Sequence, residues 1–226
     1  MVPDDAYVAR CLHLLGEWDA ALAALKPDAD PELRALILVD RWFFQIDGLA
    51  EAEEAVAALD PSSPTAQLLT ARLAYSRMLF RREPRADDRA AAEAGYRAAV
   101  ESGSEKLRGW ARFHWGVLLD LIDKDPARAL PHYEAALEIA VKTGDAYLES
   151  YVIRHLSQQK EPAERIPMLR RSLHLRASLG ARPQTLAAQA ALAYNLPEDD
   201  PERAALMETF RAGAEELRIG WLLSSE

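Results

Sequence analysis

The sequence predicts an all-α protein, a helical-repeat solenoid of about six antiparallel helix pairs. Composition is the first observation: 226 residues with 10 Gly, many Ala, Leu, Arg and Glu, and 50% hydrophobic residues favour helices around a continuous core. Apolar residues also recur at helical spacing, with breaks about every fifteen to twenty residues. Finally, the chain is similar to itself at a period of 36 to 37 residues, with two helices per period.

The breaks divide the chain into a series of expected helices. Glycine, proline and aspartate clusters, such as those at 47–48 and 61–64, mark the turns. The expected helices span residues 4–15, 17–26, 31–46, 49–59, 64–82, 87–102, 105–123, 126–143, 145–159, 163–179, 184–194 and 201–219. Pro131 and Pro167 fall several residues into two of these helices, so we expect either a later start or a bend there.

The internal similarity is clearest in two five-residue segments. YRAAV at 96–100 and YEAAL at 133–137 align at an offset of 37, and Pro131 aligns with Pro167 at an offset of 36. A small residue three positions after the aromatic or apolar residue of each unit allows two helix backbones to approach closely. These small residues are Ala99, Ala136 and Ser172. One helix pair is too thin to bury its own apolar face, so such units must stack on one another.

Residues 107–143 resemble a tetratricopeptide repeat. Gly116 takes the small position of the first helix, and Ala129, Tyr133 and Ala136 take the alanine, aromatic and alanine positions of the second. The long second helix that ends at Lys-Thr-Gly-Asp is similar to the extended repeats of bacterial regulatory members.

The resemblance implies one right-handed solenoid over residues 1–226. Residues 87–180 match the repeat pattern best, and residues 1–86 are expected to form divergent repeats. Residues 181–226 are expected to form a C-terminal helix pair or cap.

Charge and cysteine content limit the function classes. The net charge of -9 argues against a nucleic-acid binder, because phosphate neutralisation needs a large basic surface. The single cysteine, Cys11, cannot form an internal disulfide and is expected to be a core thiol. The opening MVPDD lacks a signal-peptide pattern, and no apolar run is long enough to span a bilayer. We therefore expect a cytoplasmic protein that does not interact with membranes.

The resemblance implies that partners bind the concave surface formed by the first helix of each pair. Aromatic residues beside arginine on this surface are typical of binding hot spots. The predicted ligand-binding residues are Arg72, Tyr75, Trp110, Phe113, His114 and Val117. The alternative is that Trp110 and Phe113 are packing residues.

The best-known activity of the family, a carboxylate clamp built from asparagine and lysine, is not expected here because Asn195 is the single asparagine. A weaker hypothesis of acid recognition depends on arginines in the expected first helices of the basic middle region. These are Arg72, Arg77, Arg112 and Arg154. Solvated helix faces explain the same arginines.

No residue pattern predicts chemistry. The five histidines lack the spacing of a metal site, and the chain has neither a phosphate-binding glycine loop nor a nucleophile elbow. We therefore expect no catalytic residue, no metal and no cofactor.

Two apolar segments need cover. The segment 219–223 is expected either to fold back, or to form a homodimer through Trp221 and Leu222. Trp42, Phe43 and Phe44 cannot all face one side of a helix, so at least one is expected to contact another helix pair or a partner.

The leading functional hypothesis is a non-catalytic scaffold that binds a protein or peptide on its concave face. The alternative is a ligand-sensing or peptide-sensing regulatory module that changes the shape of the solenoid on binding. An enzyme with a site on the concave face is the third and weakest hypothesis.

Overall fold

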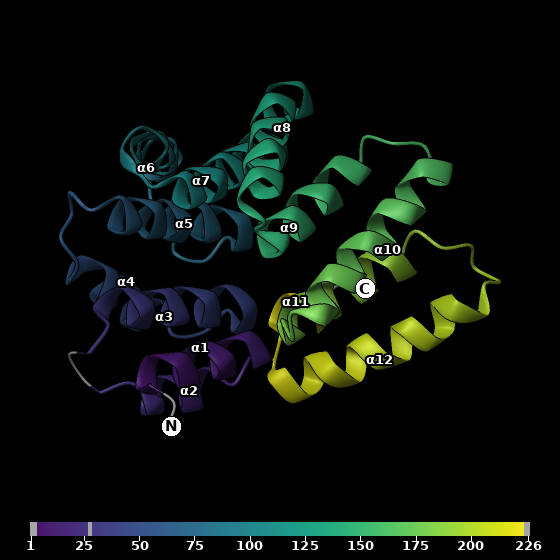
Figure 1. Cartoon of the computed structure of the whole chain (residues 1–226), viewed down its shortest axis with the longest axis horizontal. Coiled ribbons are helices and arrows are strands. Elements are labelled where there is room, and N and C mark those ends of the chain that lie inside the picture. Colours follow the sequence, from purple (N-terminus) through teal and green to yellow (C-terminus); the bar gives the residue numbers. More distant parts are fainter. Residues whose placement is uncertain (1–3, 27–28, 224–226) are drawn as a thin grey trace.

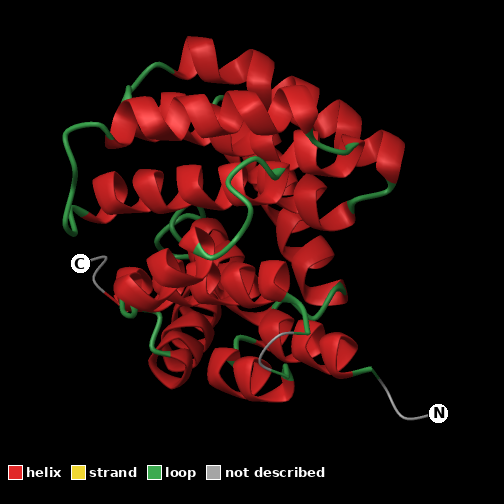
Figure 2. Ribbon diagram, turned by 90° about the vertical axis from the view of Figure 1, so that its left-hand side faces the viewer, coloured by secondary structure: helices red, strands yellow, loops and turns green. Residues whose placement is uncertain are grey.

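The computed structural model describes residues 4–26 and 29–223, and all regular structure in this part of the chain is helical (Figure 2). The first helices are α1 (Asp5–Leu15), α2 (Trp18–Ala24), α3 (Pro31–Gln45), α4 (Leu49–Ala57), α5 (Pro64–Phe80), α6 (Asp88–Ser102) and α7 (Glu105–Val117). After a π-helical turn, η1 (Leu118–Ile122), come α8 (Pro126–Thr143), α9 (Ala146–Ser157), α10 (Pro162–Ser178), α11 (Arg182–Ala193), α12 (Pro201–Leu217) and α13 (Gly220–Leu223). The all-helical prediction is confirmed. Residues 1–3, where the opening segment begins, lie outside the described residues.

Local capping chemistry sets the helix boundaries. Ser63 accepts a hydrogen bond from the Ala66 N–H (3.1 Å) at the start of α5, and Asp145 does the same for Leu148 (3.0 Å) at the start of α9. Gly144 ends α8 in a left-handed conformation with φ 66°, which glycine adopts without strain. The expected turns therefore match the observed ones within a few residues.

Consecutive helices pack against each other as pairs, from α1 with α2 to α11 with α12. The first helices of successive pairs also touch, in the order α1, α3, α5, α7 and α9, so they form an inner layer. α11 returns to contact α1, and the curved arrangement in Figure 1 brings the last pair beside the first.

The two internal prolines lie inside their helices. α8 starts at Pro126 and contains Pro131, and α10 starts at Pro162 and contains Pro167. A later helix start is therefore excluded. Both internal prolines are exposed, so water can reach the backbone around the missing hydrogen bond.

Close packing of α7 on α8 depends on Gly116. A Cβ atom at this position would lie 2.8 Å from two ring carbons of Tyr133, which is itself fully buried. The repeated small residues Ala99, Ala136 and Ser172 are likewise fully buried. The small positions recognised in the sequence are thus points where helices approach closely.

The C-terminal segment covers the inner layer near the start of the same chain. α13 packs on α3, with the Trp221 ring 6.3 Å from the Phe44 ring, and Leu222 is buried. The Gln45 amide also donates a hydrogen bond to the Leu217 carbonyl (3.1 Å). The segment therefore folds back within its own chain, and the homodimer through Trp221 and Leu222 stays a prediction.

The three consecutive aromatics of α3 reach different helix pairs, as predicted. The Trp42 ring contacts Phe80 of α5 at 6.2 Å, and the Phe44 ring contacts Trp18 of α2 at 5.8 Å. Phe43 contacts both Phe80 and the C-terminal Trp221. The aromatic triplet thus joins three parts of the chain.

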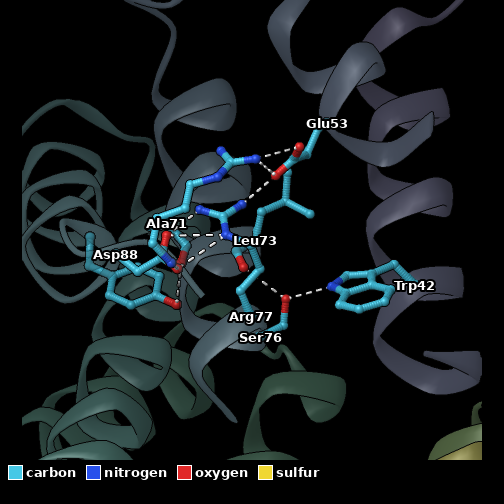
Figure 3. Close-up of polar contacts among 9 residues, drawn as sticks. Trp42, Glu53, Ala71, Leu73, Ser76, Arg77 and Asp88 are labelled. Carbon is cyan, nitrogen blue, oxygen red and sulfur yellow. Dashed lines mark hydrogen bonds and ion pairs between the residues drawn. The ribbon is translucent and has the colours of Figure 1, made fainter. Parts of the chain in front are cut away.

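A buried arginine joins helices α4, α5 and α6 (Figure 3). Arg77 of α5 donates to both oxygens of Asp88, at the start of α6, and to Glu53 of α4 (2.5 Å). Arg85 also donates to Glu53, but from an exposed position. Burial by itself raises the pKa of Asp88, but the Arg77 guanidinium and the Arg85 backbone N–H outweigh it and hold that pKa below its usual value.

We predict that Gly116→Ala lowers the free energy of unfolding by about 1 to 2 kcal/mol, because the added methyl group overlaps the Tyr133 ring. Urea denaturation followed by circular dichroism measures this change. In the matched cycle, the same substitution should cost less in a Tyr133→Leu background, where the ring is absent. Equal costs in both backgrounds would show that the ring is not the obstacle.

We predict that Arg77→Met lowers the free energy of unfolding by about 3 to 5 kcal/mol, because it leaves the buried Asp88 without its charged partner. Arg85→Met is the control: it removes an exposed partner of the same Glu53 and should cost less than about 1 kcal/mol. Chemical denaturation of both variants makes the comparison. Similar losses would contradict the assignment of Arg77 as the principal link.

Candidate functional site

The six predicted ligand-binding residues lie in one region but divide into two sets. Tyr75, Phe113 and Val117 are 4%, 2% and 5% exposed and belong to the apolar core between α5, α7 and α8. They present almost no surface to a partner, because neighbouring helices cover the side of each first helix on which they lie. Their role in binding stays a prediction.

Arg72, Trp110 and His114 are half-buried and meet side chains from other first helices. We call the resulting group the inner cluster. It consists of Asp40, Arg72, Trp110, His114, Tyr147, Tyr151, Arg154 and Arg176. Except for Arg176 of α10, its members come from the inner helices α3, α5, α7 and α9.

One end of the inner cluster is an ion pair between Arg72 of α5 and Asp40 of α3. His13 of α1 lies on the same carboxylate, with 2.7 Å between Nε2 and Oδ2. Burial by itself raises the pKa of Asp40, but Arg72 and His13 outweigh it and hold that pKa well below its usual value. Asp40 therefore stays ionised and balances the charge of Arg72.

Aromatic rings form the middle of the inner cluster. The Trp110 ring lies 5.5 Å from Tyr147 and 5.3 Å from Tyr151, and its Nε1 donates to the Asp145 carboxylate (3.2 Å). The His114 ring also contacts Trp110, with 6.0 Å between the ring centres. Burial lowers the pKa of His114 well below its ordinary value, and the charge of Arg72 lowers it further. The imidazole is therefore neutral and acts as another aromatic surface.

A directed chain of hydrogen bonds leads away from Arg154. A guanidinium can only donate, so the 3.2 Å contact between Arg154 Nη1 and His155 Nε2 makes Nε2 the acceptor. The neutral imidazole then carries its hydrogen on Nδ1, which donates to the Tyr133 hydroxyl (3.2 Å). Tyr133 in turn donates to Asp120 (3.0 Å). The order of donors thus fixes the tautomer of His155.

Burial lowers the pKa of His155 to about 4, even though Asp120 at the far end of the chain of hydrogen bonds favours the protonated form. Asp120 lies on the π-helical turn η1, an irregularity that often occurs at functional sites. The neutral side chains of His155 and Tyr133 thus connect the positively charged Arg154 to the negatively charged Asp120 by hydrogen bonds.

Arg176 forms the other end of the inner cluster. It is 2% exposed, its guanidinium carbon lies 4.4 Å from the centre of the Tyr151 ring, and Nη1 donates to the Gln184 carbonyl (2.9 Å). A second contact joins its Nε to the Ser150 hydroxyl (3.3 Å). Burial lowers the pKa of Arg176 to about 10, and the charge of Arg154 lowers it further. The side chain still carries its charge at neutral pH.

Several members of the inner cluster were not among the predicted site residues. Tyr147 and Tyr151 are separated by one helical turn on α9, a spacing that sequence reasoning could have used. Arg176 could not be found in this way, because α10 is the second helix of its pair and its outer face is polar. Two arginines of the acid-recognition hypothesis lie outside the inner cluster. Arg77 is paired with the carboxylates of Glu53 and Asp88. Arg112 lies near His132; burial lowers the pKa of His132, and the charge of Arg112 lowers it further.

Cys11 is exposed and not a core thiol, so that prediction is wrong. The core side of α1 is formed by Ala9, while Arg10 and Cys11 face outward. Within the described ranges, no three histidine, cysteine, aspartate or glutamate side chains gather as metal ligands would. None of the helices described here combines the length and apolar character needed to cross a bilayer.

In comparisons with known proteins, no family model and no curated sequence matches this chain.

We predict that the free energy of unfolding falls as the pH is lowered from about 6.5 towards 4. The folded-state pKa of His155, about 4, lies below the value of about 6.5 in the unfolded chain, so the unfolded chain binds more protons in this range. Between pH 7 and 4.5, His155 alone should account for about 2 kcal/mol of the loss. Urea titrations at both pH values measure the difference.

His155→Gln should remove that part of the pH dependence, because the amide does not titrate. His174→Gln is the control, since His174 is an exposed imidazole of α10 and its replacement should leave the wild-type slope. An unchanged slope in His155→Gln would assign the acid sensitivity to other groups.

Proposed function

We propose that this chain is a right-handed solenoid of repeats similar to tetratricopeptide repeats, and that it acts as a non-catalytic scaffold binding a protein or peptide segment on its inner face. The repeat reading is supported by the contact of Gly116 with Tyr133 and by the equivalent burial of Ala99, Ala136 and Ser172. These are the positions at which the resemblance requires small residues.

The observation that carries the binding proposal is the character of the inner cluster. Its rings from Trp110, Tyr147 and Tyr151 stand beside the guanidinium groups of Arg72 and Arg176, and the three rings keep intermediate exposure. A side chain kept for packing alone can be aliphatic, whereas rigid rings beside arginine are the composition of a recognition surface.

A second candidate is a sensing module whose shape changes on binding. It is favoured by the contacts of α11 with α1 and of α13 with α3, which join the two ends of the chain around the inner layer. A ligand that separates these contacts would change the shape of the molecule, because ligands shift populations by their different affinities for the two states.

We predict that selection from a peptide-display library enriches ligands of the inner face. His114→Ala should weaken their affinity about tenfold or more, because it removes a ring that packs on Trp110. Val141→Ser is the control, since Val141 lies on the outer helix α8 and is exposed. X-ray scattering of the complex separates the two candidates: an unchanged radius of gyration supports the scaffold, and a changed radius supports the sensor.

Failure to enrich any peptide with protein whose circular dichroism shows intact helices would contradict the scaffold. Peptides whose affinity responds to Val141→Ser but not to His114→Ala would place the binding surface on the outer layer instead.

A further inference from the structure

The charges of the inner cluster do not balance locally. Arg72 forms an ion pair with Asp40. Arg154 is connected to Asp120 by hydrogen bonds through His155 and Tyr133. For Arg176, the contacts within the described part of the chain are a backbone carbonyl, a serine hydroxyl and an aromatic ring. A buried guanidinium is thus held here by neutral groups.

Another buried arginine of this protein, Arg77, is neutralised by carboxylates. Arg77, which is 6% exposed and also buried, has two carboxylates on its guanidinium. An isolated buried cation is costly, and packing alone could use an aliphatic side chain of similar length at position 176. The contrast indicates that the charge of Arg176 serves something other than folding.

Arg154 offers a second donor in the same place. Its Nη1 is used by His155, but its Nε is buried and has no hydrogen-bond partner among the described atoms. Tyr151 and Arg154 are three residues apart on α9, so their side chains are neighbours on that helix, and the Arg176 guanidinium carbon lies 4.4 Å from the centre of the Tyr151 ring. In agreement with this geometry, the charge of Arg154 adds to burial in lowering the pKa of Arg176. Two cationic forks therefore stand near one aromatic ring.

We propose that a carboxylate group of the ligand binds at the half-buried side chains of Arg154 and Tyr151, where the unbalanced charge of the buried Arg176 attracts it. A guanidinium fork matches the two oxygens of a carboxylate and gains most where water is scarce. The inference rests on the proposed function, because it specifies which chemical group of the ligand binds the inner face. The carboxylate has two possible sources, an acidic side chain of a peptide or a free small dicarboxylate.

The test uses the full-length protein and three probes: a pool of nine-residue peptides with glutamate at the centre, the same pool with glutamine, and free glutarate. Affinity is measured by isothermal titration calorimetry, and the melting temperature with and without each probe. We expect the glutamate pool to bind at least tenfold more tightly than the glutamine pool. Arg154→Met and Arg154→Lys should each remove most of that preference, since lysine keeps the charge but loses the planar fork, and Arg176→Met should reduce it.

Two controls separate binding from folding. Arg171→Met changes an exposed arginine of the same helix that pairs with Glu149, and it should leave affinity unchanged. Without any probe, Arg176→Met should melt no lower than the wild-type protein, because it removes a buried charge that lacks a carboxylate. If Arg176→Met does not fold, Arg154→Lys decides the question by the same affinity measurement.

Each outcome has a distinct meaning. Equal binding of the glutamate and glutamine pools overturns the carboxylate inference and leaves the scaffold proposal standing. Binding of glutarate alone, lost in the Arg154 variants, supports the carboxylate site but contradicts a peptide as its source. If neither peptide pool nor glutarate binds, the carboxylate inference and the peptide-binding function both fall.

Discussion

The structure depends on the close approach of helices that cannot bury their apolar faces alone. Each pair is only two helices thick, so its core is completed by the next pair. The approach is set by small residues such as Gly116 and Ala136, against which Tyr133 and its neighbours pack. A larger side chain at these positions would overlap its neighbours and force the two helices apart.

This spacing decides what the inner helices present. Because α1, α3, α5, α7 and α9 lie side by side and α11 returns to α1, side chains directed inward meet side chains from helices distant in sequence. Asp40 and Arg72 form an ion pair across 32 residues of chain. The arrangement that buries apolar surface therefore also creates a polar, aromatic interior.

Three buried or half-buried arginines have different partners. Arg77 is surrounded by carboxylates and joins helix pairs, so its role is structural. Arg154 is linked to a carboxylate through His155 and Tyr133. Arg176 is held by neutral groups and a ring. Since the cost of a buried charge depends on its partners, these differences separate positions that maintain the fold from a position suited to an anionic ligand.

The sequence by itself determined the helical class, the order of the helices and the small packing positions, because these follow from local periodicity, capping residues and internal similarity. It also placed Arg72, Trp110 and His114 on the inner helices. Only the tertiary structure decided that Tyr75, Phe113 and Val117 are covered, and that Arg176 reaches inward from an outer helix. Burial and charge balance depend on which helices meet across the molecule, and that information is not contained in the spacing along one helix.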